Sequence, residues 1–159
     1  MTYTAAKSAP SFTFDKALEM KDAGLIAADA AWGVGGSAKV LDVGTGNFEG
    51  KCVVNVSAIE IATGDERYTF LLQGSSSATF ASDVVILAAL PVGDGSTIGT
   101  AFGSSGVDVD DTTGRFVIPF TNERNNTRYR YIRGWTDVSG TIATGINFTA
   151  FVAMAEGTN

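Results

Sequence analysis

Arginine is concentrated in one part of the chain. Five of the six arginines lie between Gly114 and Trp135, in GRFVIPFTNERNNTRYRYIRGW, where two runs of alternating apolar and polar residues flank a turn-like NERNN. Planar guanidinium groups bind phosphates and carboxylates through paired hydrogen bonds. The segment therefore raises three hypotheses: a phosphate site, a nucleic-acid surface, or a seam that meets an acidic partner.

Strand alternation divides these arginines between two faces. It puts Arg128 and Arg130 on one face, and Tyr129 and Tyr131 on the other, where the tyrosines would be core or part-buried. Arg133 would lie on the opposite side from Arg130 unless the strand bulges between them. In the preceding strand, the same rule predicts a buried set of Phe116, Ile118 and Phe120.

Two interpretations of the arginines remain open. In the first, they pair with Glu123 and nearby acids on a solvated sheet face, at ~0–1 kcal/mol for each exposed pair. In the second, they form a rigid array of donors that meets carboxylates on another chain.

The residues that usually perform catalysis are scarce. The chain has no histidine, which removes the commonest general base, the usual serine triad and most transition-metal sites. The single cysteine, Cys52, excludes an intrachain disulfide and a zinc knuckle, and its apolar context KCVVNV predicts a small buried side chain. The hydroxyls of SSS (75–77) have no identifiable activating base. We therefore expect a non-enzymatic protein without a cofactor, with a carboxylate-dependent hydrolase as a minor alternative.

Two short motifs look like ligand-binding loops. GTGNFEG (44–50) looks like part of a phosphate loop, but such a loop opens a helix, whereas strand-like KCVVNV follows here, so we predict a turn. DVDDTTG (108–114) gathers three carboxylates that could bind Ca²⁺. It lacks the glutamate and the spacing of a twelve-residue calcium loop, and we interpret it as a solvated acidic loop.

The composition restricts the class of protein. Of the 159 residues, 45% are apolar and 18% are charged, which is below the usual ~25%, and the surface is expected to be buried in part against partner chains. The net charge of −6 disfavours nucleic-acid binding. The N-terminus lacks the pattern of a signal peptide, and no window approaches the ~20 apolar residues that cross a bilayer. We expect a soluble product of a cytosol that binds no membrane.

The pattern of short apolar runs predicts an all-β fold. Residues 1–14 are expected to form an extended arm, and residues 15–159 a single domain. Residues 15–32 predict a short strand followed by an irregular segment, and GVGG (33–36) a turn. Further strands are predicted at 39–44, 51–62, 67–74, 84–90, 115–120, 128–135 and 146–154. Strands at this spacing without a strong crossover helix indicate an antiparallel β-sandwich of jelly-roll type.

Four local features refine this prediction. In 51–62 the apolar parity switches after Val56 to Ile59 and Ile61, which is typical of a β-bulge or a strand that turns a corner. TGDE (63–66) predicts a hairpin turn, and VVILAAL (84–90) a strand covered on both faces. Pro119 cannot donate to a ladder, so its strand is expected at an edge or bulged.

An ordered series of segments resembles a known family. VLDVGTGNFEGKCVVNVSAIEIATGDERYTFLLQGS, followed by GRFVIPFTNERNNTRYRYIRGWTDVSGTIATGINFTAFVA, is similar to the tailed-bacteriophage capsid cement proteins of the Bordetella-phage type. The resemblance covers roughly residues 15–153. It consists of an LD-V-G strand, a strand-turn-strand ending in LQGS, the RFVIPFTNE turn, the YRYIR strand and a final apolar strand.

The resemblance implies a jelly-roll-like cement, or decoration, protein on the outer surface of a virion, made in the cytoplasm of a bacterial host. Such a protein binds the assembled head and stabilises contacts between subunits of the major capsid protein. It would act as a homo-oligomer, for which we prefer a homotrimer slightly over a homodimer. The family implies no catalytic residues. From the chain's own residues, the candidates for protein interfaces are Tyr3, Pro10, Phe12, Phe14, Glu123, Arg124, Arg128, Arg130 and Arg133.

A second hypothesis belongs to another class of function. A carbohydrate-binding or adhesion β-sandwich module of a virion would use Trp32, Trp135 and the tyrosines as stacking platforms. The alternative for both tryptophans is simple burial in the core.

Overall fold

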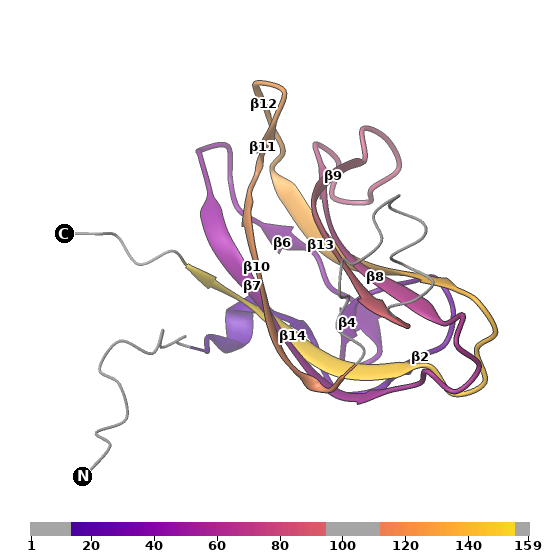
Figure 1. The fold of residues 1–159 in the computed structure, drawn as a ribbon. Coiled ribbons are helices and arrows are strands. Elements are labelled where there is room, and N and C mark those ends of the chain that lie inside the picture. Colours follow the sequence, from indigo (N-terminus) through magenta and orange to yellow (C-terminus); the bar gives the residue numbers. More distant parts are fainter. Residues whose placement is uncertain (1–13, 95–111, 155–159) are drawn as a thin grey trace, which may run out of the picture.

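The computed structural model describes residues 14–94 and 112–154 and shows two antiparallel sheets packed face to face (Figure 1). Of the interface candidates, Tyr3, Pro10 and Phe12 lie outside the described residues, as does the acidic run 108–111. In the first sheet the strand order is β1 (Glu19–Lys21), β14 (Ile146–Met154), β7 (Glu49–Ile59) and β10 (Gly114–Thr121), with β2 (Leu25–Ile26) also paired to β14. In the second it is β3 (Ala30–Ala31), β13 (Tyr131–Ser139), β8 (Arg67–Ser75) and β9 (Val85–Gly93), with β6 (Leu41–Asp42) also paired to β13.

The order in which the chain visits the two sheets confirms the jelly roll. The chain alternates between the sheets from β1 to β3, β7 and β8, makes one hairpin from β8 to β9, and then alternates again through β10, β13 and β14. This path of eight strands is that of a double Greek key. Two small hairpins complete the described fold, β4 (Gly33–Val34) with β5 (Ser37–Ala38) and β11 (Glu123–Arg124) with β12 (Thr127–Arg128).

The core lies between the two sheets and is built by strand alternation. β7 contributes Cys52, Val54 and Val56, β8 contributes Tyr68, Phe70 and Leu72, and β14 contributes Ile146, Phe148, Ala150 and Val152. Cys52 is buried and free, as expected of a small core side chain. Burial raises the pKa of its thiol to about 12.

A buried indole fixes the distance between the sheets. Trp32 is fully buried, and its ring meets Phe70 and Phe148 edge-on, with centroids 5.9 and 5.2 Å away. Its Nε1 donates to Thr136 Oγ1 at 2.8 Å. The ring lies directly over Gly134 of β13, where a Cβ would come within 2.0 Å of it. The indole therefore leaves no room for a side chain at position 134, which explains the glycine.

The parity switch in β7 marks a bulge, as the sequence predicted. Asn147 of β14 pairs with Ala58, but the next residue, Phe148, pairs with Val56, so Ser57 is the extra residue. Beyond the bulge Ile59 packs against the core, whereas Ile61 is 37% exposed.

Two connections differ from the sequence expectations. TGDE (63–66) is not a hairpin turn, because β7 and β8 belong to different sheets and pair with other strands. The VVILAAL strand is not covered on both faces: β9 is the last strand of its sheet, and Val84 and Ile86 are 41% and 44% exposed. An apolar run has the same appearance in a covered strand and in an edge strand.

The remaining predictions differ in detail. The strand expected at 39–44 is reduced to Leu41–Asp42. Residues 15–32 were predicted as one short strand followed by an irregular segment; they form a short 3₁₀ turn, η1 (Lys16–Leu18), followed by three short strands, β1, β2 and β3. Pro119 lies in β10, an edge strand that pairs with β7 alone among the described strands, which is where a sheet tolerates proline.

Candidate functional site: the arginine segment and the open sheet edge

The arginine segment does not form a single hairpin. Its first strand, β10, belongs to the first sheet and its last strand, β13, to the second, with the β11–β12 hairpin between them (Figure 1). The expected strand 128–135 is divided after Arg128, because Tyr129 N donates to Asn122 O and Arg130 O accepts from Val43 N, both at 2.9 Å. The five guanidinium groups therefore lie in separate surroundings.

The β11–β12 hairpin carries three of the interface candidates, Glu123, Arg124 and Arg128. Asn125 and Asn126 have φ of 51° and 61°, as a two-residue type I′ turn requires. The expected pairing is present: Arg128 Nε lies 3.1 Å from Glu123 Oε2. Arg124 instead reaches β9, where its Nη1 donates to the carbonyl oxygen of Ile86 at 2.8 Å. The hairpin is thereby tied to the sheet edge.

A buried asparagine positions this hairpin. Asn122 is fully buried, and its Oδ1 accepts from Phe48 N at 2.9 Å. Its Nδ2 donates to the carbonyls of Gly46 and Tyr129 at 3.0 and 3.2 Å. The sequence analysis did not identify Asn122. Its place two residues after Phe120, in the core-facing parity of β10, is the signal that could have revealed it.

Arg130 makes a two-pronged pair with Asp42 of β6. Arg130 Nε and Nη2 lie 2.8 Å from Asp42 Oδ1 and Oδ2. These hydrogen bonds, with one from Gly44 N, lower the pKa of Asp42 to about 2 and raise that of Arg130. Both side chains are about half exposed, at 48% and 47%, so the pair is a surface contact.

Arg133 lies on the outer face of the second sheet, between two aromatic rings. Its guanidinium carbon is 4.4 Å from the Phe80 ring centroid and 4.9 Å from that of Trp135, and its Nε donates to Gln73 Oε1 at 2.8 Å. Burial lowers the pKa of Arg133. Tyr131 shares this outer face, since the core-facing residues of β13 are the even-numbered ones. Tyr129 and Tyr131 are both part-buried, which the sequence analysis allowed, but Tyr131 is not in the core.

The tryptophans differ in what they can contact. Trp32 is inaccessible to a sugar because it is 0% exposed, which confirms the alternative of core burial for that residue. Trp135 is part-buried on the outer face, with Arg133 against its ring.

Carboxylates near the β7–β8 connection accept hydrogen bonds from backbone N–H groups. Glu66 is fully buried and accepts the N–H groups of Thr63 and Gly64 at 2.7 and 2.9 Å. Burial alone would raise the pKa of Glu66, but these hydrogen bonds outweigh it and hold the pKa at about 2. Glu60 similarly accepts from the amides of 143–145. Across residues 14–94 and 112–154, no group of three or more His, Cys, Asp or Glu side chains could hold a metal ion.

β9 is an edge strand that carries exposed apolar side chains near the arginines. Among the described strands β9 pairs with β8 alone. Val84 and Ile86 are exposed on or beside it, and Arg124 occupies one edge carbonyl. Open strand edges accept further strands unless charges or covering segments prevent it.

The sequence was compared with known proteins. No protein-family model matches the chain, and no curated protein matches it. In the described part of the chain, no helix has the length and apolar character needed to cross a membrane.

Proposed function

We propose that the chain is a capsid decoration protein of a bacteriophage, which binds the outer surface of the assembled head and stabilises contacts between major capsid protein subunits. The observation that carries the proposal is the apolar edge strand β9 on a jelly-roll sandwich, in which Ile86 is 44% exposed and Val84, just before the strand, is 41% exposed. Exposed apolar side chains on an open edge favour a partner chain.

The described surfaces also support attachment through several contacts. The interface candidates Arg128 and Arg130 are each paired on the chain itself, by exposed contacts that cost little to exchange for a partner's carboxylate. One such contact is weak. A symmetric oligomer, of which we prefer the homotrimer, repeats it at each subunit and gains by effective concentration. Selective binding to the assembled shell stabilises that state by mass action.

The direct test uses heads with and without the protein. Undecorated heads are mixed with the purified protein, and bound protein is measured by co-sedimentation and rupture by release of DNA on heating. Decorated heads are expected to rupture at a higher temperature. Equal heat resistance with and without the protein would reject the proposal.

A matched pair of variants tests the edge strand. Ile86→Lys places a charge on β9 and is expected to weaken binding to heads at least about tenfold. Ile61→Lys, which changes a similarly exposed isoleucine at the β7–β8 connection, is expected to bind as the wild type does. Deletion of residues 1–13 tests the arm and is expected to weaken attachment while the melting temperature is retained. Wild-type binding by Ile86→Lys would exclude the edge from the contact.

A further inference from the structure

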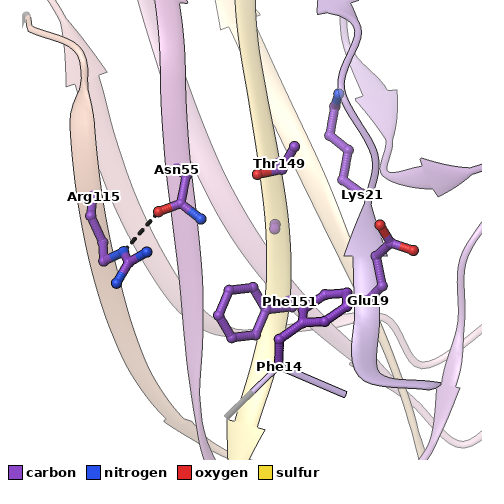
Figure 2. Close-up of a pocket in the computed structure, with 8 residues that line it drawn as sticks. Phe14, Glu19, Lys21, Asn55, Arg115, Thr149 and Phe151 are labelled. Carbon is purple, nitrogen blue, oxygen red and sulfur yellow. Dashed lines mark hydrogen bonds between the residues drawn. The ribbon is translucent and has the colours of Figure 1, made fainter. Parts of the chain in front are cut away.

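The outer face of the first sheet carries two neighbouring rows of different chemistry. Cross-strand register places Thr149, Asn55 and Arg115 side by side in one row. The next row along the strands consists of Phe151, Val53 and Val117. Figure 2 shows the polar row above the aromatic pair formed by Phe14 and Phe151. The rows are two residues apart, which in a strand is ~6.4–6.8 Å.

The apolar row has a buried floor and two exposed ends. Val53 and Phe151 are 0% and 8% exposed, so they form the floor. Phe14 packs edge-on against Phe151 at 5.3 Å and remains 53% exposed, while Val117 at the other end is 39% exposed. Phe14, Phe151, Asn55 and Arg115 belong to the lining of an open pocket of about 350 Å³.

The polar row presents hydrogen-bond donors that no carboxylate of the described residues binds. Arg115 Nε donates to Asn55 Oδ1 at 2.8 Å, which fixes both side chains and leaves the outer nitrogens of the guanidinium and the amide Nδ2 as donors (Figure 2). The carboxylate of Glu19, also in the pocket, pairs with Lys16. Lys21 donates to three backbone carbonyls. Among the described residues, no carboxylate pairs with Arg115, although the protein is acidic overall.

We propose that this face binds an extended, acidic segment of a partner protein. An aspartate or glutamate of that segment accepts hydrogen bonds from Arg115 and Asn55, and an apolar side chain two residues away packs between Phe14 and Val117. The spacing fits, because residues i and i+2 of an extended peptide lie on one face and are as far apart as the two rows. Charge-assisted hydrogen bonds to a guanidinium give such a contact its preference for a carboxylate over an amide.

The observations above give the chemistry of the partner segment. That the segment belongs to a neighbouring chain in the capsid rests on the proposed function. A peptide probe tests it on the isolated protein. Fluorescence anisotropy measures binding of the labelled peptide GSTDTFTS. Saturable binding of this peptide is expected. Binding should be about five- to tenfold weaker for GSTNTFTS, in which asparagine replaces the aspartate, and for GSTDTSTS, in which serine replaces the phenylalanine. Absence of saturable binding, or equal binding of all three peptides, would overturn the inference.

Variants of the protein locate the site. Arg115→Gln and Val117→Ser are each expected to weaken peptide binding about fivefold or more. Lys39→Gln, which removes a positive charge from the connection between β5 and β6, outside both proposed binding surfaces, is the control and should bind as the wild type does. Wild-type affinity of Arg115→Gln would overturn the assignment. The two proposals can be rejected separately. Equal binding of the wild type and Arg115→Gln to heads would reject this site alone. Peptide binding without binding to heads would reject the decoration function.

Discussion

Replacing Gly134 by alanine is expected to destabilise the fold strongly. The new methyl group would lie 2.0 and 2.1 Å from Cε3 and Cδ2 of Trp32, whereas carbon atoms in contact are ~3.5–4.0 Å apart. The indole must therefore retreat by ~1.5 Å or more. It is held by the Nε1 hydrogen bond to Thr136 and by the rings of Phe70 and Phe148. If the ring stays in the core under strain, the cost is ~1–3 kcal/mol. If the ring is expelled, the cost approaches the ~3–5 kcal/mol of removing a tryptophan from a core. We therefore expect the free energy of unfolding to fall by about 3 kcal/mol or more.

Urea unfolding followed by tryptophan fluorescence measures this loss. In a domain of this size, about 3 kcal/mol also lowers the melting temperature by ~6–12 °C. The matched control is Gly114→Ala, also on a strand, where a Cβ would meet nothing within 4 Å, and its stability should change by less than ~0.5 kcal/mol. Identical unfolding midpoints for the two variants would show that the indole does not pack on Gly134.

Two further predictions concern titratable groups. Because the folded-state pKa of Asp42 is lowered from 3.8 to about 2, its carboxylate stabilises the fold above about pH 4, and that contribution is lost as the pH falls toward 2. The difference in melting temperature between wild type and Asp42→Asn should therefore shrink from pH 6 to pH 2.5, and a constant difference would contradict the pairing with Arg130. The buried Cys52 thiol, with its pKa raised to about 12, should not react with a disulfide reagent at pH 8 until urea unfolds the protein, so rapid labelling of the native protein would place the residue outside the core.

Local pattern predicted the strands well because burial alternates with residue number. The reversal of parity after Val56 located a bulge, and Pro119 located an edge. The same local signals could not give the partner of each strand. TGDE turns the chain equally well into a hairpin or into the opposite sheet, and the choice was made by β14, whose pairing with β7 is remote in sequence.

The candidate site was predictable only where partners are close in sequence. The pair of Arg128 with Glu123 followed from a five-residue hairpin separation. The partner of Arg130 is Asp42, 88 residues away, and the ring pair around Arg133 includes Phe80 from a loop. Contacts of this kind depend on the assembled fold, so no spacing in the sequence reveals them.

The position of β14 has a consequence for how the protein is made. This strand, the last of the described sheet strands along the chain, lies inside its sheet and joins β1 and β2 to β7. During synthesis the ribosome must release residues up to 154 before the first sheet can close, and until then one side of β7 lacks its partner strand. Closure of the first sheet in a nascent chain therefore waits for the synthesis of β14, and a chain truncated before Ile146 would be left with an unfilled place in its sheet and exposed to aggregation.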